Sequence, residues 1–152
     1  MRQNSFMGNF VTLAVAGSRK TQGIVDYCCD LSPDKRVIVL TFTQTNQTEL
    51  RSRFRKYVGI HPNVTIMGWY TFLLRDFARP FLPFKFPGER VLGFNFDGRP
   101  HRMAAGRNRF LDSNGFAYAC ELGRLAHELM GQSGGALLSR VLKKSALFLN
   151  SY

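Results

Sequence analysis

The sequence predicts an α/β fold in which a parallel sheet is flanked by helices. Two apolar runs, residues 10–16 and 37–43, have the length and the β-branched content of strands that are buried on both faces. Between them, apolar residues of the stretch 20–31 recur at helical spacing, which leaves Asp26 and Asp30 for the solvent face. Strand, helix and strand in this order form a βαβ unit, whose strands are parallel and whose crossover is right-handed.

The segment after the second strand predicts another helix. Asn46 is expected to be its N-cap, with Glu49 three residues later completing a capping box. Residues at a spacing of four form its inner face, namely Leu50, Phe54 and Val58. Four basic residues occupy the rest: Arg51, Arg53, Arg55 and Lys56. Such a run is usually a solvated helix face, but the absence of a partnering acid among the four favours a role in contacting phosphates.

A third strand is expected at 64–67, followed by a helix at 72–78. Trp69 and Tyr70 lie where this strand gives way to the helix. Ligands of α/β sheets gather beyond the carboxyl ends of strands, and aromatic rings placed there can stack on nucleic-acid bases. Phe72 is equally well explained as a core residue, whereas a binding surface explains Trp69 and Tyr70 better.

The region from residue 80 to residue 114 has a different character. The preceding helix has to end before Pro80, and Pro and Gly recur in the sequence that follows. Acids are missing between Asp97 and Asp112, whereas basic residues are frequent there, including Arg99, Arg102, Arg107 and Arg109. This composition predicts an inserted, partly irregular basic segment.

The last part of the chain predicts two helices and a strand. The first helix covers 116–130, and its expected inward residues are Ala119, Cys120, Gly123, Ala126 and Met130. A glycine-rich break separates it from a short helix at 136–144, and a strand follows at 146–149. The resulting division is a loose N-terminus at 1–9, a core at 10–80, a basic and partly helical insertion at 81–145, and a truncated final core strand at 146–152.

Small residues and a Lys-Thr pair separate the first strand from the first helix. Strand, small-residue turn, Lys-Thr and helix is the layout of a phosphate-binding loop, G-x-x-x-x-G-K-[ST]. Backbone N–H groups would surround the phosphate, Lys20 would reach it and the Thr21 hydroxyl would bind Mg²⁺. Ala14 and Arg19 replace the two glycines, and Arg19 stands where a residue without a Cβ is often needed. The loop alone is therefore equally compatible with an ordinary strand–turn–helix.

The composition favours a polyanionic partner. The 152 residues carry a net charge of +11 with a pI near 10.2, which points first to nucleic acid and second to an anionic membrane surface. A basic surface that serves only solubility is the weaker alternative, because the arginines are clustered. No run is long enough to span a membrane, and the N-terminal apolar run is a poor signal peptide, so we expect a cytoplasmic protein.

The cysteines and histidines argue against a disulfide framework and against a metal site built from them. Cys28, Cys29 and Cys120 include no C-x-x-C pair, and the three histidines are scattered without ligand spacing. Cys28 and Cys29 would point in different directions on a helix and pack as small apolar side chains.

Three short motifs follow one another along the chain. They are A-G-S-R-K-T at 16–21, V-L-T-F-T-Q-T-N-Q-T-E-L at 39–50 and M-G-W-Y-T-F-L-L-R at 67–75. In letters, order and spacing they resemble the motifs of the N-terminal ATP-binding domain of UvrD/Rep-type superfamily 1 DNA helicases. The resemblance covers roughly residues 10–80, and the remainder of the chain matches only in layout.

The resemblance implies a P-loop NTPase fold of the RecA-like type, incomplete here, that binds ATP, Mg²⁺ and single-stranded DNA. The implied nucleotide-binding residues are Ala16, Gly17, Ser18, Arg19, Lys20, Thr21 and Gln22, with Thr21 on the metal. The implied DNA-binding residues are Thr41, Thr43, Asn46, Trp69 and Tyr70. In this family two RecA-like domains close on ATP and step along one DNA strand, and this chain would supply only the first domain.

The acidic motif that ATP hydrolysis needs is missing from its expected place. One carboxylate of that Asp-Glu pair holds Mg²⁺ and the other orients the attacking water. If the final strand is the one that should carry the pair, Asn150 and Ser151 stand in its place; if it is another strand, the chain stops before the motif. Gln3 is a poor match to the glutamine that reads adenine. We therefore expect a truncated or degenerate domain that binds ATP and DNA without turnover, with the C-terminal helicase domains in a parent protein.

Two other functions remain as alternatives. A non-enzymatic, basic nucleic-acid-binding module would explain the charge without use of the loop. A small kinase would use the loop, but it needs an acidic catalytic base that the sequence does not present.

Overall fold

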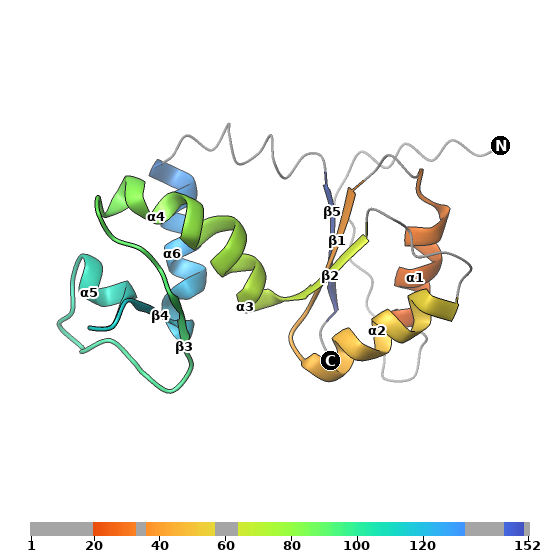
Figure 1. Cartoon of the computed structure of the whole chain (residues 1–152), viewed down its shortest axis with the longest axis horizontal. Coiled ribbons are helices and arrows are strands. Elements are labelled where there is room, and N and C mark those ends of the chain that lie inside the picture. Colours follow the sequence, from red (N-terminus) through yellow and green to blue (C-terminus); the bar gives the residue numbers. More distant parts are fainter. Residues whose placement is uncertain (1–19, 33–35, 57–63, 133–144, 151–152) are drawn as a thin grey trace.

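The computed structural model describes residues 20–32, 36–56, 64–132 and 145–150. The predicted strand at 10–16, the predicted helix at 136–144 and Val58 lie outside these residues. Within them the protein has a mixed α/β fold in which the ladders between named strands are parallel (Figure 1).

Three strands form the central sheet: β1 (Arg36–Thr41), β2 (Val64–Gly68) and β5 (Ser145–Asn150). Their order is β2-β1-β5, and both neighbours pair with β1 in parallel, which confirms the predicted parallel arrangement for these strands. Thr41 is in register with Gly68 on one side and with Asn150 on the other. The carboxyl ends of all three strands therefore lie at one edge of the sheet.

Two helices, α1 (Lys20–Asp30) and α2 (Gln44–Lys56), cover one face of this sheet (Figure 1). Alternate side chains of a strand point to opposite faces, and Val37 and Val39 enter a buried cluster with both helices. The helical members of this cluster are Val25, Cys28, Leu50 and Phe54. The predicted inner face of α2 is thus confirmed for Leu50 and Phe54, and both aspartates of α1 are exposed as expected.

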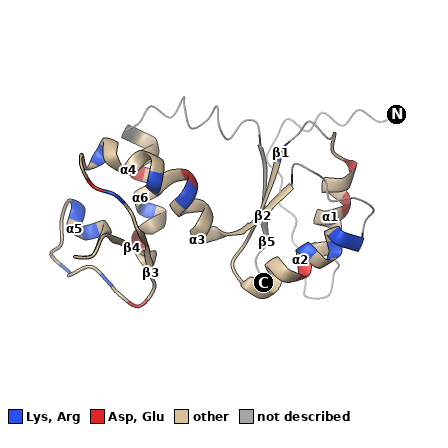
Figure 2. Cartoon of the chain, in the orientation of Figure 1, with Lys and Arg blue, Asp and Glu red and all other residues tan. Residues whose placement is uncertain are grey.

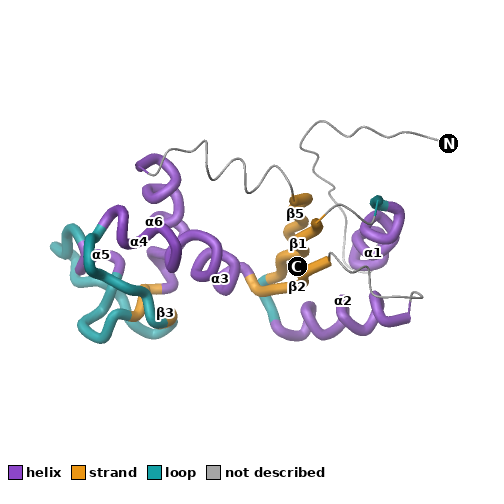
Figure 3. The backbone as a smooth tube through the Cα atoms, turned by 45° about the horizontal axis from the view of Figure 1, so that its top comes forward, coloured by secondary structure: helices purple, strands orange, loops and turns teal. Residues whose placement is uncertain are grey.

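The opposite face carries a larger, mostly helical unit (Figure 3). A continuous helical stretch consists of α3 (Trp69–Phe72), the π-helical η1 (Leu73–Ala78) and α4 (Arg79–Lys85), and α6 (Ala119–Gln132) packs against it. Two three-residue strands and a short helix complete the unit: β3 (Gly93–Asn95), β4 (Phe116–Tyr118) and α5 (Arg107–Phe110). Leu40 of β1 belongs to the buried cluster of this unit.

The prediction that the helix ends before Pro80 is wrong. The chain remains helical through Pro80 and Pro83 to Lys85. In η1 the backbone N–H of Arg79 donates to the carbonyl of Leu74, five residues earlier. This wider turn precedes Pro80, which occupies the first turn of α4, where a missing N–H is tolerated.

The prediction for residues 116–130 is wrong in its start and in part of its inner face. Residues 116–118 form β4, and the helix begins at Ala119. Its buried residues are Ala119, Leu122, Leu125, Ala126 and Leu129. Cys120, Gly123 and Met130 are exposed instead. The leucines fill the inner face because a helix with a repeat of 3.6 residues brings them to one side.

Cys28 and Cys29 point in different directions, as predicted. Cys28 is buried in the cluster beneath α1, and this burial raises the pKa of its thiol to about 12. Cys29 is exposed. No group of three His, Cys, Asp or Glu side chains in the described parts of the chain is placed to hold a metal ion. None of the described helices has the length and apolar character needed to cross a membrane.

Candidate nucleotide and nucleic-acid site

The start of α1 places the Lys-Thr pair of the predicted phosphate-binding loop. Ala16, Gly17, Ser18 and Arg19 lie outside the described residues. The described part of α1 runs from Lys20 to Asp30, and Lys20, Thr21 and Gln22 are its first described residues. Thr21 is buried, with 6% of its surface exposed, and Gln22 is half-buried. The helical position of Lys20 and Thr21 is compatible with the predicted loop, whose phosphate-binding role stays a prediction.

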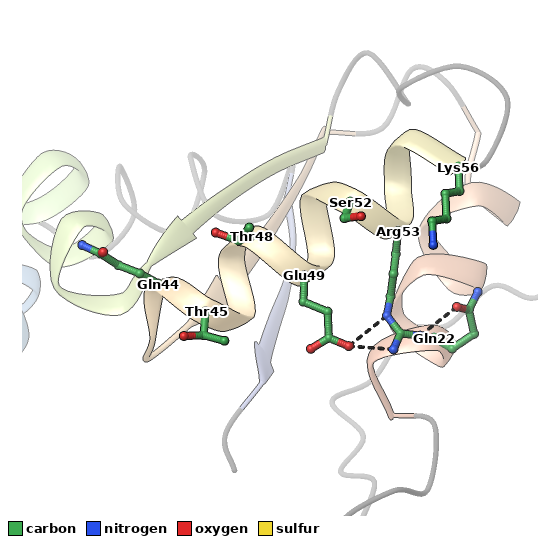
Figure 4. Close-up of a pocket in the computed structure, with 8 residues that line it drawn as sticks. All are labelled: Gln22, Gln44, Thr45, Thr48, Glu49, Ser52, Arg53 and Lys56. Atoms are coloured by element: carbon green, nitrogen blue, oxygen red, sulfur yellow. Dashed lines mark hydrogen bonds and ion pairs between the residues drawn. The ribbon is translucent and has the colours of Figure 1, made fainter.

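A hydrogen-bonded network links Gln22 of α1 to α2 (Figure 4). The Arg53 guanidinium donates to the Glu49 carboxylate through two nitrogens, at 3.1 and 2.6 Å, and to the side-chain carbonyl of Gln22 at 3.1 Å. The Gln22 amide in turn donates to Asp26 at 2.8 Å. Arg53 is therefore held in one orientation between the two helices.

An open pocket of about 900 Å³ lies along this network and α2. Hydroxyl groups of Thr45, Thr48 and Ser52 line it along α2, and Lys56 extends from the last turn of α2 toward α1 (Figure 4). The lining is thus rich in hydrogen-bonding groups and carries two cations and one carboxylate. Such a surface can accept a polar ligand that has both donors and acceptors.

The N-cap of α2 is Thr43, so the prediction that Asn46 is the cap is wrong. The hydroxyl oxygen of Thr43 accepts the backbone N–H of Asn46 at 3.2 Å. Asn46 lies within the first turn and is buried, with 7% exposed. A cap needs a hydroxyl or carboxamide just outside the helix, and the strand that ends at Thr41 leaves Thr43 in that position. Glu49 pairs with Arg53 instead of completing a capping box.

The predicted DNA-binding residues follow the carboxyl ends of β1 and β2, but they differ in burial. Thr43 is exposed, and Trp69 and Tyr70 are partly exposed. Thr41 is fully buried, and its hydroxyl donates to the backbone carbonyl of Thr43 at 3.1 Å. Thr41 and Asn46 therefore support the backbone on which Thr43 is presented. Whether any of the five residues contacts DNA stays a prediction.

Aromatic rings extend this edge further than the sequence suggested. Phe42, directly after β1, is 48% exposed, and its ring centroid lies 6.2 Å from that of Trp69. On the other side, Tyr70 contacts the rings of Phe94 and Phe96. The spacing of about 25 residues between Tyr70 and these phenylalanines gave no local signal for their proximity. Phe42 could have been found, since it lies inside the second motif.

Near α3, Gly68 provides the space for the chain to pass α2. A Cβ built on Gly68 would meet the side-chain amide of Gln47 at 3.1 Å, which is tight for a methyl group. Gly68 is also the residue just before α3, with an extended backbone. A small residue there keeps Trp69 close to the loop after β1.

Figure 2 shows that basic and acidic residues occur together on elements such as α2. Several of the basic residues are paired with acids. The basic run of α2 contains no acid, which favoured a role in contacting phosphates, but Arg53 is paired with Glu49 one turn earlier. Arg51 donates to the backbone carbonyl of Ile66 at 3.2 Å, and after α4 Arg107 pairs with Glu89 and Arg109 with Glu121. Six exposed basic residues form neither an ion pair nor a side-chain hydrogen bond with any described residue: Arg36, Arg55, Lys56, Arg90, Arg99 and Arg102.

The final strand lies where the missing acidic motif was sought. β5 is the neighbour of β1, and Asn150 is in register with Thr41 at the carboxyl edge. Ser151 lies outside the described residues. An asparagine at this place has no charge to offer a cation.

Comparisons of the chain with protein-family models, with curated proteins and with solved structures find no match.

Proposed function

We propose that this chain binds ATP-Mg²⁺ and single-stranded DNA in the manner of the first RecA-like domain of UvrD/Rep-type helicases. One observation supports the proposal: the second and third motifs have the strand–turn–helix layout that such a domain would use. Lys20 is the first described residue of α1, and the second and third motifs each run from a parallel strand, across its carboxyl end, into a helix. These carboxyl ends share one edge, which is where α/β sheets bind ligands.

The described residues fit a bound nucleotide in part. Lys20 would contact its phosphates, and the Thr21 hydroxyl would be one ligand of Mg²⁺, which takes its other ligands from phosphate oxygens and water. ATP supplies the phosphoanhydride bond whose cleavage drives the related helicases. This chain has Asn150 beside Thr41 where a carboxylate is needed, so we expect binding without turnover.

The test is nucleotide binding by the purified chain, measured with a fluorescent ATP analogue with and without Mg²⁺. We expect saturable, Mg²⁺-dependent binding that Lys20→Ala abolishes. Arg102→Ala, which removes an exposed cation of the insertion, serves as the matched control and should bind as the wild type does. Equal binding by Lys20→Ala and wild type would contradict the assignment of the loop.

Turnover is tested separately with a sensitive ATPase assay in the presence of single-stranded DNA. We expect no activity above background. Hydrolysis that disappears in Lys20→Ala would show that the chain is a complete ATPase, and would overturn the expected inactivity.

A second candidate function is a basic nucleic-acid-binding module that does not use nucleotides. The six exposed cations with neither an ion pair nor a side-chain hydrogen bond among the described residues favour it, since they are available to phosphates. In that case DNA binding should weaken steeply with salt, because bound cations are released from DNA, and ATP should leave it unchanged. Salt titrations with and without ATP-Mg²⁺ distinguish the two functions.

A further inference from the structure

Three aromatic rings from two distant segments meet beside the start of α3. The ring centroids of Tyr70 and Phe96 are 5.0 Å apart with their planes at 84°, and those of Phe94 and Phe96 are 4.9 Å apart at 73°. Tyr70 and Phe94 are separated by 6.3 Å. We call these three residues the Tyr70 platform. Phe96 is 58% exposed, so that much of its ring is open to a ligand.

The backbone around Phe96 is fixed by its neighbours. The side-chain carbonyl of Asn95 accepts the backbone N–H groups of Asp97 at 3.1 Å and of Gly98 at 2.7 Å. The Asn95 amide donates to Asp112 at 3.1 Å. A Cβ on Gly98 would lie only 2.5 Å from the Asn95 amide nitrogen, so this tight turn requires glycine. The exposed ring is therefore presented from a rigid turn, which lowers the entropy lost when a ligand stacks on it.

We propose that the Tyr70 platform stacks a base of a single-stranded nucleic acid. The proposal rests on the proposed binding of such a strand and extends its path from the sheet edge onto the segment that follows α4. Every base has a π face, and aromatic platforms in single-strand-binding proteins use it without sequence preference. The same segment holds Arg99 and Arg102, both exposed and without an ion pair among the described residues, as partners for phosphates.

The exposed aromatic ring and the basic residues of this segment together indicate the chemistry of the ligand. An exposed ring in the same segment as two exposed cations, Arg99 and Arg102, matches a ligand that carries flat rings on a polyanionic backbone. The net charge of +11 likewise favours a polyanionic ligand. We therefore expect binding with little base preference but with a clear need for bases.

The experiment measures anisotropy of a short fluorescein-labelled oligothymidylate and of an abasic strand of equal length and charge. The wild type should bind oligothymidylate more tightly, and Phe96→Ala should weaken that binding by roughly 5- to 100-fold, the range for loss of one stacked base. The abasic strand should bind Phe96→Ala and wild type equally. Phe96→Leu, which keeps an apolar side chain without a ring, should resemble Phe96→Ala.

Phe84→Ala is the matched control, because Phe84 is a more exposed phenylalanine, at 73%, on α4. It should bind as the wild type does, and circular dichroism should show that all variants are folded. If the wild type binds oligothymidylate and Phe96→Ala binds it equally well, the platform has no such role while the proposed function stands. If the wild type binds neither strand, both the platform and the proposed DNA binding are wrong.

Discussion

At the scale of single residues, Asp112 is the most heavily hydrogen-bonded carboxylate that the structure describes. Its oxygens accept the backbone N–H groups of Asn114 and Phe116, both at 2.9 Å, and the side-chain amide of Asn95. The Phe116 N–H is the main cause of a lowered Asp112 pKa, and Asn95, Asn114 and nearby Arg107 act in the same direction. Asp112 thereby fixes the turn before β4 to the turn that presents Phe96.

Asp112→Asn should lower the melting temperature at neutral pH by about 2–4 °C, the shift for about 1 kcal/mol in a chain of this size. The folded-state pKa lies below the ordinary value of 3.8. The stabilisation is therefore complete above that value and is lost as the pH falls through the lowered pKa. Melting curves of variant and wild type should converge in this acid range.

Asp97→Asn is the control for that experiment, because Asp97 is an exposed carboxylate in the neighbouring turn. It should leave the melting temperature nearly unchanged at every pH. A difference between Asp112→Asn and wild type that persists unchanged into acid would contradict the assigned role of the carboxylate charge.

At the scale of elements, helix ends and helix faces depend on neighbours that lie outside each helix. α2 begins where the Thr43 hydroxyl is placed by the end of β1. The helical path from α3 to α4 continues through Pro80 because a π-helical turn precedes it. In both cases the element before the helix determines how the helix begins.

Thr43→Ala should destabilise the protein by about 1 kcal/mol, since it removes the acceptor of the Asn46 N–H. Thr45→Ala is the matched control, because Thr45 is an exposed threonine one residue inside the same helix. Urea denaturation gives the free energy of unfolding for both variants. A larger loss for Thr45→Ala than for Thr43→Ala would show that the cap is misassigned.

The inner face of α6 can be tested with a pair of apolar residues. Leu125 is fully buried, whereas Met130 is 37% exposed. Leu125→Ala should cost about 2–5 kcal/mol through lost burial and the resulting cavity, and Met130→Ala less than about 1 kcal/mol. If chemical denaturation shows a larger loss of stability for Met130→Ala than for Leu125→Ala, the inner face of α6 would be the one predicted from the sequence, which includes Met130.

At the scale of the whole molecule, β1 joins two buried clusters on the opposite faces of one sheet. Val39 belongs to the cluster beneath α1 and α2, and Leu40 to the cluster of the helical unit that includes α6. Adjacent residues of one strand therefore connect both halves of the fold. A strand shared in this way favours unfolding of both halves in one cooperative transition.

Leu40→Ala should lower stability by about 2–5 kcal/mol without separating the two halves. Trp69, the single tryptophan of the chain, packs against the Leu40 cluster and reports on that face by its fluorescence. Its thermal transition should coincide with that of far-ultraviolet circular dichroism in wild type and in Leu40→Ala. Val39→Ala, on the opposite face, should shift both probes together as well, whereas two separate transitions would show that the halves unfold independently.

Much of the core and part of the candidate site could be predicted from local patterns. Apolar patterns predicted α1 and the three strands of the described sheet. The positions of Lys20, Thr43 and Trp69 relative to these elements followed from the order of the motifs. β3 and β4 were missed, because three residues are too few to show a period. Phe96 was missed as a neighbour of Tyr70, because no local rule links residues so far apart.

The sequence by itself determined the alternation of strands and helices, the charge, and the edge at which the motif residues gather. These follow from short-range periodicity and from the parallel direction that βαβ connections impose. Only the tertiary structure decided which side chains on that edge are available. It buried Thr41 and Asn46, bound Arg53 to Glu49 and Gln22, and placed Phe96 against Tyr70. The physical reason is that burial and pairing depend on contacts between segments, which no local pattern encodes.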